Sequence, residues 1–179
     1  PMLRTILIFG LLAGAVVAVP MNLMMIFGKE GDGSHSLFTG YALMLLAFTF
    51  TFVGVKHYRD RALGGVIRFL PALLVGLGIS LVASLIYVIA WEITLHATNF
   101  TFMADYSQAM IERARARGDS PEALARLTAE MQAMQVKYAN PLFRLPMTFA
   151  EIFPVGLLVS GVSAGLLRNC RFLPMKVVQ

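Results

Sequence analysis

Residues 69–95 read FLPALLVGLGISLVASLIYVIAWEITL, and the first charged side chain in this stretch is Glu92. A helix needs about 20 predominantly apolar residues to cross the hydrocarbon core of a bilayer. Pro71 falls in the first turn, where a proline costs little because its missing N–H would have no helical partner. The stretch therefore predicts a transmembrane helix, and the rest of the chain is interpreted around it.

Three further apolar runs extend over about residues 5–27, 37–55 and 142–167. Small residues recur at four-residue steps in three of the four runs, which lets helices approach closely in lipid. They are Gly10, Gly14 and Ala18, then Gly76, Ser80 and Ser84, and finally Gly161 and Gly165. The pattern predicts an all-α polytopic membrane protein, a bundle of four transmembrane helices.

The composition supports this class. The chain is 58% hydrophobic and 14% charged, whereas soluble domains are about 45–50% apolar and about 25% charged. Its net charge of +5 is explained by cations near the ends of the spans, so we expect no nucleic-acid partner. Cys170 is the single cysteine, which excludes an intramolecular disulfide, and we expect neither a cofactor nor a metal.

The segment between the third and fourth spans is different in kind. Residues 97–140 hold five cations and five anions. The sequence GDSP at 118–121 breaks one helix and starts another, with Ser120 as N-cap and Pro121 at the first helical position. An apolar stripe follows at helical spacing, at Leu124, Leu127, Met131, Met134 and Tyr138. We expect a helical hairpin over about residues 100–139.

Charges beside the spans predict the orientation. Lys56, Arg59, Arg61 and Arg68 outnumber Asp60 between the second and third spans, and the C-terminal tail carries three cations and no acid. Short cytoplasmic loops carry an excess of Lys and Arg. We therefore expect residues 1–179 to form a single membrane domain with both termini in the cytoplasm and the hairpin in the periplasm.

A group of short motifs resembles a known family. They are GVKHYRD at 54–60, LGG at 63–65 with Ile67, LG at 77–78, LVASLIY at 81–87, and Trp91. Together they are similar to the bacterial membrane family called domain of unknown function forty-one-ninety-nine. The resemblance implies two spans, a charged turn, a third span, a charged excursion and a final span in a bacterial inner membrane. It implies no activity.

Polar residues of the outer half of the bundle form the first candidate site. Ionisable groups within membrane spans usually face a bundle interior or a wet cavity. A pocket for a ligand or a proton would use Asn22, Glu92, His96, Arg144 and Glu151. In the alternative interpretation Glu92 only pairs with Arg144 at the interface, and Glu151 is a structural acid beside a kink at Pro154. Two acids and one histidine make a weak zinc set, so no metal site is predicted.

The charged turn after the second span is the second candidate site. Juxtamembrane cations attract anionic headgroups, by about 1 kcal/mol each. Lipid headgroups or a protein partner would contact Lys56, Tyr58, Arg59, Asp60 and Arg61. In the alternative interpretation these cations only fix the topology, which leaves Tyr58 and Asp60 unexplained.

Three classes of function remain open. The sequence has no nucleophile elbow, HExxH motif or phosphate-binding loop, which disfavours a membrane enzyme. A small transporter or lipid-binding protein would use the outer polar pocket, and with four spans it would have to be oligomeric. We favour a non-catalytic subunit or assembly factor that docks partners. The expected partners are membrane lipid and either a second copy or another membrane protein.

Overall fold

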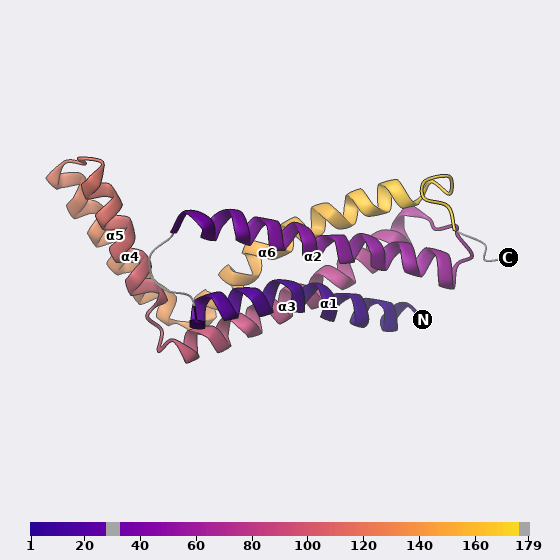
Figure 1. Ribbon diagram of the computed structural model, residues 1–179, viewed down its shortest axis with the longest axis horizontal. Helices are drawn as coiled ribbons and strands as arrows, with labels where there is room; N and C mark the ends of the chain where they lie inside the picture. Colours follow the sequence, from indigo (N-terminus) through magenta and orange to yellow (C-terminus); the bar gives the residue numbers. More distant parts are fainter. Residues whose placement is uncertain (28–32, 176–179) are drawn as a thin grey trace. The chain divides into compact units, whose positions relative to one another are not determined.

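The computed structural model describes residues 1–27 and 33–175 (Figure 1). Within these ranges the chain forms six α-helices and no strand, which confirms the all-α class. The helices are α1 (Met2–Phe27), α2 (Gly33–Ala62), α3 (Phe69–Ala97), α4 (Phe102–Ala116), α5 (Pro121–Ala139) and α6 (Pro141–Leu167).

Three of the helical segments are long and apolar enough to cross a membrane. They are Met2–Leu23, Phe69–Ala97 and Pro141–Leu167, with mean hydropathies of 2.3, 2.5 and 1.7. An apolar helix of this length matches the thickness of a bilayer. These three helices indicate a membrane protein.

The chain divides into two compact units. One unit comprises Pro1–Trp91 and Phe149–Gln179, and it is called the apolar unit here. The other comprises Glu92–Thr148, with α4, α5 and the adjoining ends of α3 and α6, and it is called the polar unit. The apolar unit therefore contains most of the apolar helices, and the polar unit contains the charged segment between the third and fourth predicted spans.

Small residues bring the helices of the apolar unit close together. A Cβ atom added to Gly10 of α1 would lie 2.6 Å from Cβ of Val82 in α3. Between α3 and α6, a Cβ atom on Gly156 would lie 2.7 Å from Cβ of Ser80. Both distances are shorter than real carbon contacts, so only glycine permits the observed packing. The first two small-residue stripes therefore lie at helix–helix contacts, as predicted.

The surface of the apolar unit is more apolar than that of a water-soluble domain, and polar groups are buried beside its apolar core. Its interior contains buried hydroxyl groups, and Ser80 Oγ lies 3.1 Å from Ser160 Oγ. Its surface carries large aliphatic side chains such as Leu45 and Leu158, both 67% exposed. Burying small residues and exposing leucines suits helices that pack in lipid, where apolar surface gains nothing from burial.

The segment that the sequence presented as a charged turn is helical. Residues 56–61 form the last part of α2, which ends at Ala62. Lys56 and Asp60 are four residues apart and form an ion pair, a spacing that supports a helix. The chain reverses after them, at Gly64 and Gly65, which have φ values of +64° and +91°. Glycine adopts this left-handed conformation without a steric penalty.

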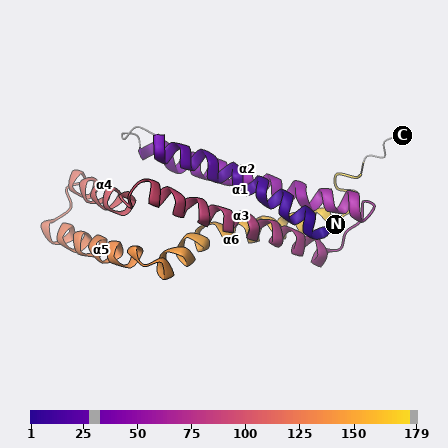
Figure 2. The ribbon, with the colours of Figure 1, turned by 90° about the horizontal axis from the view of Figure 1, so that it is seen from below.

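In the polar unit α4 and α5 lie side by side (Figure 2). Ser120 is the N-cap of α5, and its hydroxyl accepts a hydrogen bond from the Ala123 N–H at 3.2 Å. Pro121 occupies the first helical position, and Gly118 has a φ of +80° in the preceding turn. The break predicted at residues 118–121 is confirmed, and we call these two helices the α4–α5 pair.

Candidate functional site

Arg144 and Glu92 form a two-pronged ion pair in the polar unit. Nε of Arg144 donates to Oε1 of Glu92 at 2.6 Å, and Nη2 donates to Oε2 at 2.8 Å. The side chain of Arg144 is 3% exposed, and that of Glu92 is 22% exposed. Paired parallel hydrogen bonds are the strongest arrangement of these two groups. The pair that the sequence offered as one interpretation of Glu92 is therefore present.

The remaining donor group of Arg144 closes the end of a helix. Nη1 donates to the carbonyl oxygens of Tyr138 and Ala139 at 2.8 and 3.3 Å, and these are the last two residues of α5. The final carbonyls of a helix lack partners within the helix and carry its partial negative charge. Arg144 satisfies both needs, so the cluster holds α3, α5 and α6 together within the polar unit.

Aromatic rings surround this guanidinium. Its carbon Cζ lies 5.3 Å from the centre of the Phe100 ring and 5.8 Å from that of Tyr138, within the range of a cation–π contact. Asn99 and Phe100 have φ values of +52° and +58°, which is unusual for residues with side chains. The strained backbone after α3 places the Phe100 ring over Arg144, a feature that no sequence pattern indicated.

His96 lies beside the ion pair and outside its hydrogen bonds. Its Nδ1 is 2.8 Å from the carbonyl oxygen of Glu92, and its exposed ring meets Phe100 edge-on at 4.8 Å. Within residues 1–27 and 33–175, no three His, Cys, Asp or Glu side chains are grouped so that they could hold a metal ion.

Asn22 and Glu151, the other two residues of the predicted outer pocket, belong to the apolar unit. The Asn22 side chain donates to the carbonyl oxygen of Ala18 at 2.8 Å, one turn earlier in α1. Glu151 is exposed on α6. The structure therefore brings together Glu92, His96 and Arg144, and a pocket shared by all five residues stays a prediction.

Arg59 is the centre of a second cluster, in the apolar unit. It is completely buried, and its Nε donates to Oδ1 of Asp60 at 2.7 Å. Nη1 donates to the carbonyl oxygens of Leu167 at 3.5 Å and Phe172 at 2.9 Å, while Nη2 donates to that of Leu173. Leu167 is the last residue of α6. Arg59 thus joins the end of α2 to the end of α6 and to the segment after it.

Asp60 is held in its charged form. Burial acts to raise the pKa of its carboxyl group, but the hydrogen bonds from Arg59 and Lys56 together outweigh burial and lower it below the ordinary value. Tyr58 is half-buried against the core and Arg61 is exposed. Of the three cations among the residues predicted to bind headgroups, Lys56 and Arg59 pair with Asp60, whereas Arg61 lies on the surface of the described chain.

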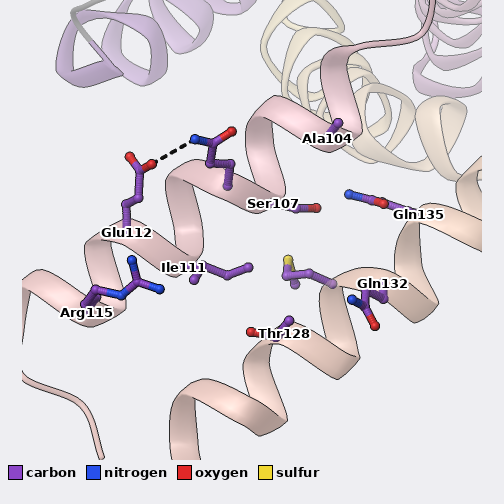
Figure 3. A pocket seen from close by; sticks show the side chains of 10 residues that line it. Ala104, Ser107, Ile111, Glu112, Arg115, Thr128, Gln132 and Gln135 are labelled. Atoms are coloured by element: carbon purple, nitrogen blue, oxygen red, sulfur yellow. Dashed lines mark hydrogen bonds between the residues drawn. The ribbon is translucent and has the colours of Figure 1, made fainter. Parts of the chain in front are cut away.

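A groove of about 370 Å³ lies between α4 and α5 (Figure 3). Ser107 and Ile111 of α4 face Thr128 and Gln135 of α5 across it, and Gln108 donates to Glu112 at 2.9 Å on its rim. The full lining is Ala104, Ser107, Gln108, Ile111, Glu112, Arg115, Thr128, Met131, Gln132 and Gln135. The groove is rich in amide groups, which can both donate and accept hydrogen bonds.

The sequence indicated the apolar stripe of α5 but missed this groove. The stripe residues Leu124, Leu127, Met131 and Met134 are half-buried rather than enclosed. Its glutamines, Gln108, Gln132 and Gln135, are spread over two helices, so their spacing in the sequence does not indicate a shared groove. The signal that was available is Ile111, an apolar residue of α4 that lines the groove together with Met131 of the α5 stripe.

The apolar helices, with their aliphatic outer surface, define a helical membrane protein. A family model described as "Protein of unknown function (DUF4199)" matches residues 8–169. The chain belongs to this family. No curated protein and no solved structure matches it.

Proposed function

We propose that this protein is a non-catalytic accessory subunit of the bacterial inner membrane that docks a partner protein through the α4–α5 pair. In this proposal the chain crosses the membrane four times, with both termini in the cytoplasm and the α4–α5 pair in the periplasm. The excess of cations around residues 56–68 and in the tail supports this orientation.

The observation that carries the proposal is the surface of the α4–α5 pair. The stripe residues of α5 are half-exposed, and an open groove lined by polar side chains lies between the two helices. Methionine side chains adapt their shape to different partners. Amide groups beside them supply directional hydrogen bonds. A surface of this kind suits recognition of another protein more than chemistry on a small molecule.

The transport alternative has less support. It needs polar side chains that are available to a solute, whereas both oxygens of Glu92 accept from Arg144. The remaining donor group of Arg144 is bonded to the end of α5. Because Arg144 and Glu92 neutralise each other, the cluster is suited to holding α3, α5 and α6 in place.

A photo-crosslinking experiment in growing bacteria tests the docking role. A benzoylphenylalanine residue replaces Gln132, which lines the groove, or Glu122, an exposed residue of the same helix outside the groove. We expect illumination to give a discrete adduct with one protein at Gln132, identified by mass spectrometry, and none at Glu122. Adducts of equal yield at both positions, or none at Gln132, would contradict docking through the groove.

A further inference from the structure

One acidic side chain lies on the outside of an apolar helix. Glu151 is exposed, although it belongs to the apolar segment Pro141–Leu167. It lies ten residues after Pro141, about 15 Å along the helix axis. Among the described residues no side chain hydrogen-bonds to its carboxylate or forms an ion pair with it. A charged group in such a position faces either lipid or another protein.

The same face of α6 is apolar beyond Glu151. Leu158 and Val162 follow at steps of seven and four residues, which keeps them on one side of a helix. They are 67% and 53% exposed. Acidic residues within membrane spans are rare, and they almost always pair with a cation or line a wet cavity. An acid at the edge of a leucine-rich face is therefore expected to meet a partner there.

A shallow apolar groove lies beside these residues. It has a volume of about 340 Å³ and lies between α2 and α6, with Leu158, Val162 and Ser163 on the α6 side. On the other side it is lined by Leu45, Phe48, Thr49 and Phe52. A Cβ atom added to Gly161 or Gly165 would meet nothing within 4 Å. No described atom therefore lies against α6 at these two glycines.

The charges favour a partner of a different sequence over a second copy. On α6 and just beyond it, the cations are Arg144 and Arg168. Arg144 is buried in its contacts with Glu92 and α5, and Arg168 follows the end of the helix, 17 residues after Glu151. A second copy placed symmetrically would bring another Glu151, and two like charges at one interface repel.

We infer that the exposed face of α6 docks a transmembrane helix of a different protein, one that carries a lysine or arginine at the level of Glu151. The ion pair fixes the register, and the groove between α2 and α6 receives the apolar side chains around it. This inference rests on the proposed accessory role and adds a contact inside the membrane to it.

Reconstituted vesicles provide the test. The full-length protein and a synthetic Leu/Ala helix of about 20 residues, with one lysine a third of the way along it, carry a fluorescence donor and acceptor. A matched peptide has leucine in place of the lysine. We expect the lysine peptide to associate roughly fivefold or more tightly than the leucine peptide, and this preference to disappear for Glu151→Gln. Gly161→Leu should weaken both peptides by filling the open surface.

Three outcomes would overturn the inference: equal association of the two peptides, a lysine preference that survives Glu151→Gln, or self-association of the protein alone that is lost in this variant. The last would make a second copy the occupant. Circular dichroism of each variant checks the fold, which should be unchanged because Glu151 is exposed and a Cβ atom at Gly161 meets nothing within 4 Å. The peptide assay tests only the face of α6, and crosslinking at Gln132 tests only the groove of the α4–α5 pair. A failure of one experiment therefore leaves the other proposal standing.

Discussion

Nε and Nη2 of Arg144 contact separate oxygens of Glu92, a residue 52 positions earlier in the chain, at 2.6 and 2.8 Å. Arg59 also shares its donors between a carboxylate and backbone carbonyls, and its Nε lies 2.7 Å from Oδ1 of Asp60. In each case one carboxylate neutralises the cation, and the donors that remain close the C-terminal end of a helix, α5 or α6. Both arginines therefore act on helix ends that would otherwise lack partners.

Replacing Arg144 by methionine should destabilise the protein by about 3 kcal/mol, since it leaves the Glu92 carboxylate without its partner. The partial exposure of Glu92 keeps the loss near the lower end of the range for buried pairs. We expect Arg126→Met, at an exposed position of α5, to change stability by less than about 0.5 kcal/mol. Thermal unfolding in detergent, followed by circular dichroism, measures both.

A double-mutant cycle separates the ion pair from its surroundings. With Glu92→Met added to Arg144→Met, no unpaired charge remains, so the double variant should regain part of the stability lost in the single one. If the two single losses simply add, the pair contributes nothing of its own, and the loss in Arg144→Met arises from its contacts with the carbonyl oxygens of α5 and with the two aromatic rings.

Arg59→Lys should release the segment that follows α6. A lysine keeps the charge but cannot reach Asp60 and three carbonyl oxygens at once, because it lacks the planar fork of arginine. Trypsin should then cleave after Arg171 several times faster than in the unaltered protein, with the fragments read by mass spectrometry. Arg61→Lys, at the exposed cation two residues on, is the matched control and should leave the cleavage rate unchanged.

Asp60 predicts a pH dependence. Its pKa in the folded protein lies below the ordinary value of 3.8, so folding favours the charged carboxylate. The stabilisation is fully present above that value and is lost as the pH falls through the lower pKa of the folded state. We expect Asp60→Asn to unfold at a lower temperature than the unaltered protein at pH 7. The difference between the two unfolding temperatures should narrow below pH 3.8. A difference that stays constant down to the most acidic pH would refute a stabilising role for the Asp60 carboxylate.

Cys170 offers a direct test of the proposed orientation, because it is exposed and is the single cysteine. A membrane-impermeant maleimide should label it in permeabilised spheroplasts and leave it unlabelled in intact ones. In a variant with Cys170→Ser and Ser120→Cys, intact spheroplasts should be labelled. Labelling of Cys170 in intact spheroplasts would place the C-terminus outside.

The sequence predicted what depends on local periodicity and composition. The apolar helices, the break at residues 118–121 and the glycine contacts of α1 all follow from spacing along a single helix. The partner of Glu92 was foreseen because Arg144 was expected at the same interface.

What could not be predicted depends on how a helix is rotated against its neighbours. Arg59 and Arg61 are two residues apart, and only the rotation of α2 makes one buried and the other exposed. The acceptors of Arg59 come from residues 167–173, more than 100 positions away. The exposure of Glu151 has the same origin, because a sequence gives the depth of a residue along a helix and leaves its facing direction open.

The close packing of small residues inside the apolar unit, under a surface of leucines, has an evolutionary consequence. At a position such as Gly156, where added carbon would overlap Ser80, almost every substitution is harmful. At Leu45 or Leu158 one aliphatic side chain can replace another at little loss. Drift in this lineage should therefore accumulate on the outer leucines, while the small interior residues resist change. Gly161 and Gly165 have open space where a Cβ atom would lie. If they resist change as strongly as Gly156, a neighbouring molecule must impose the selection.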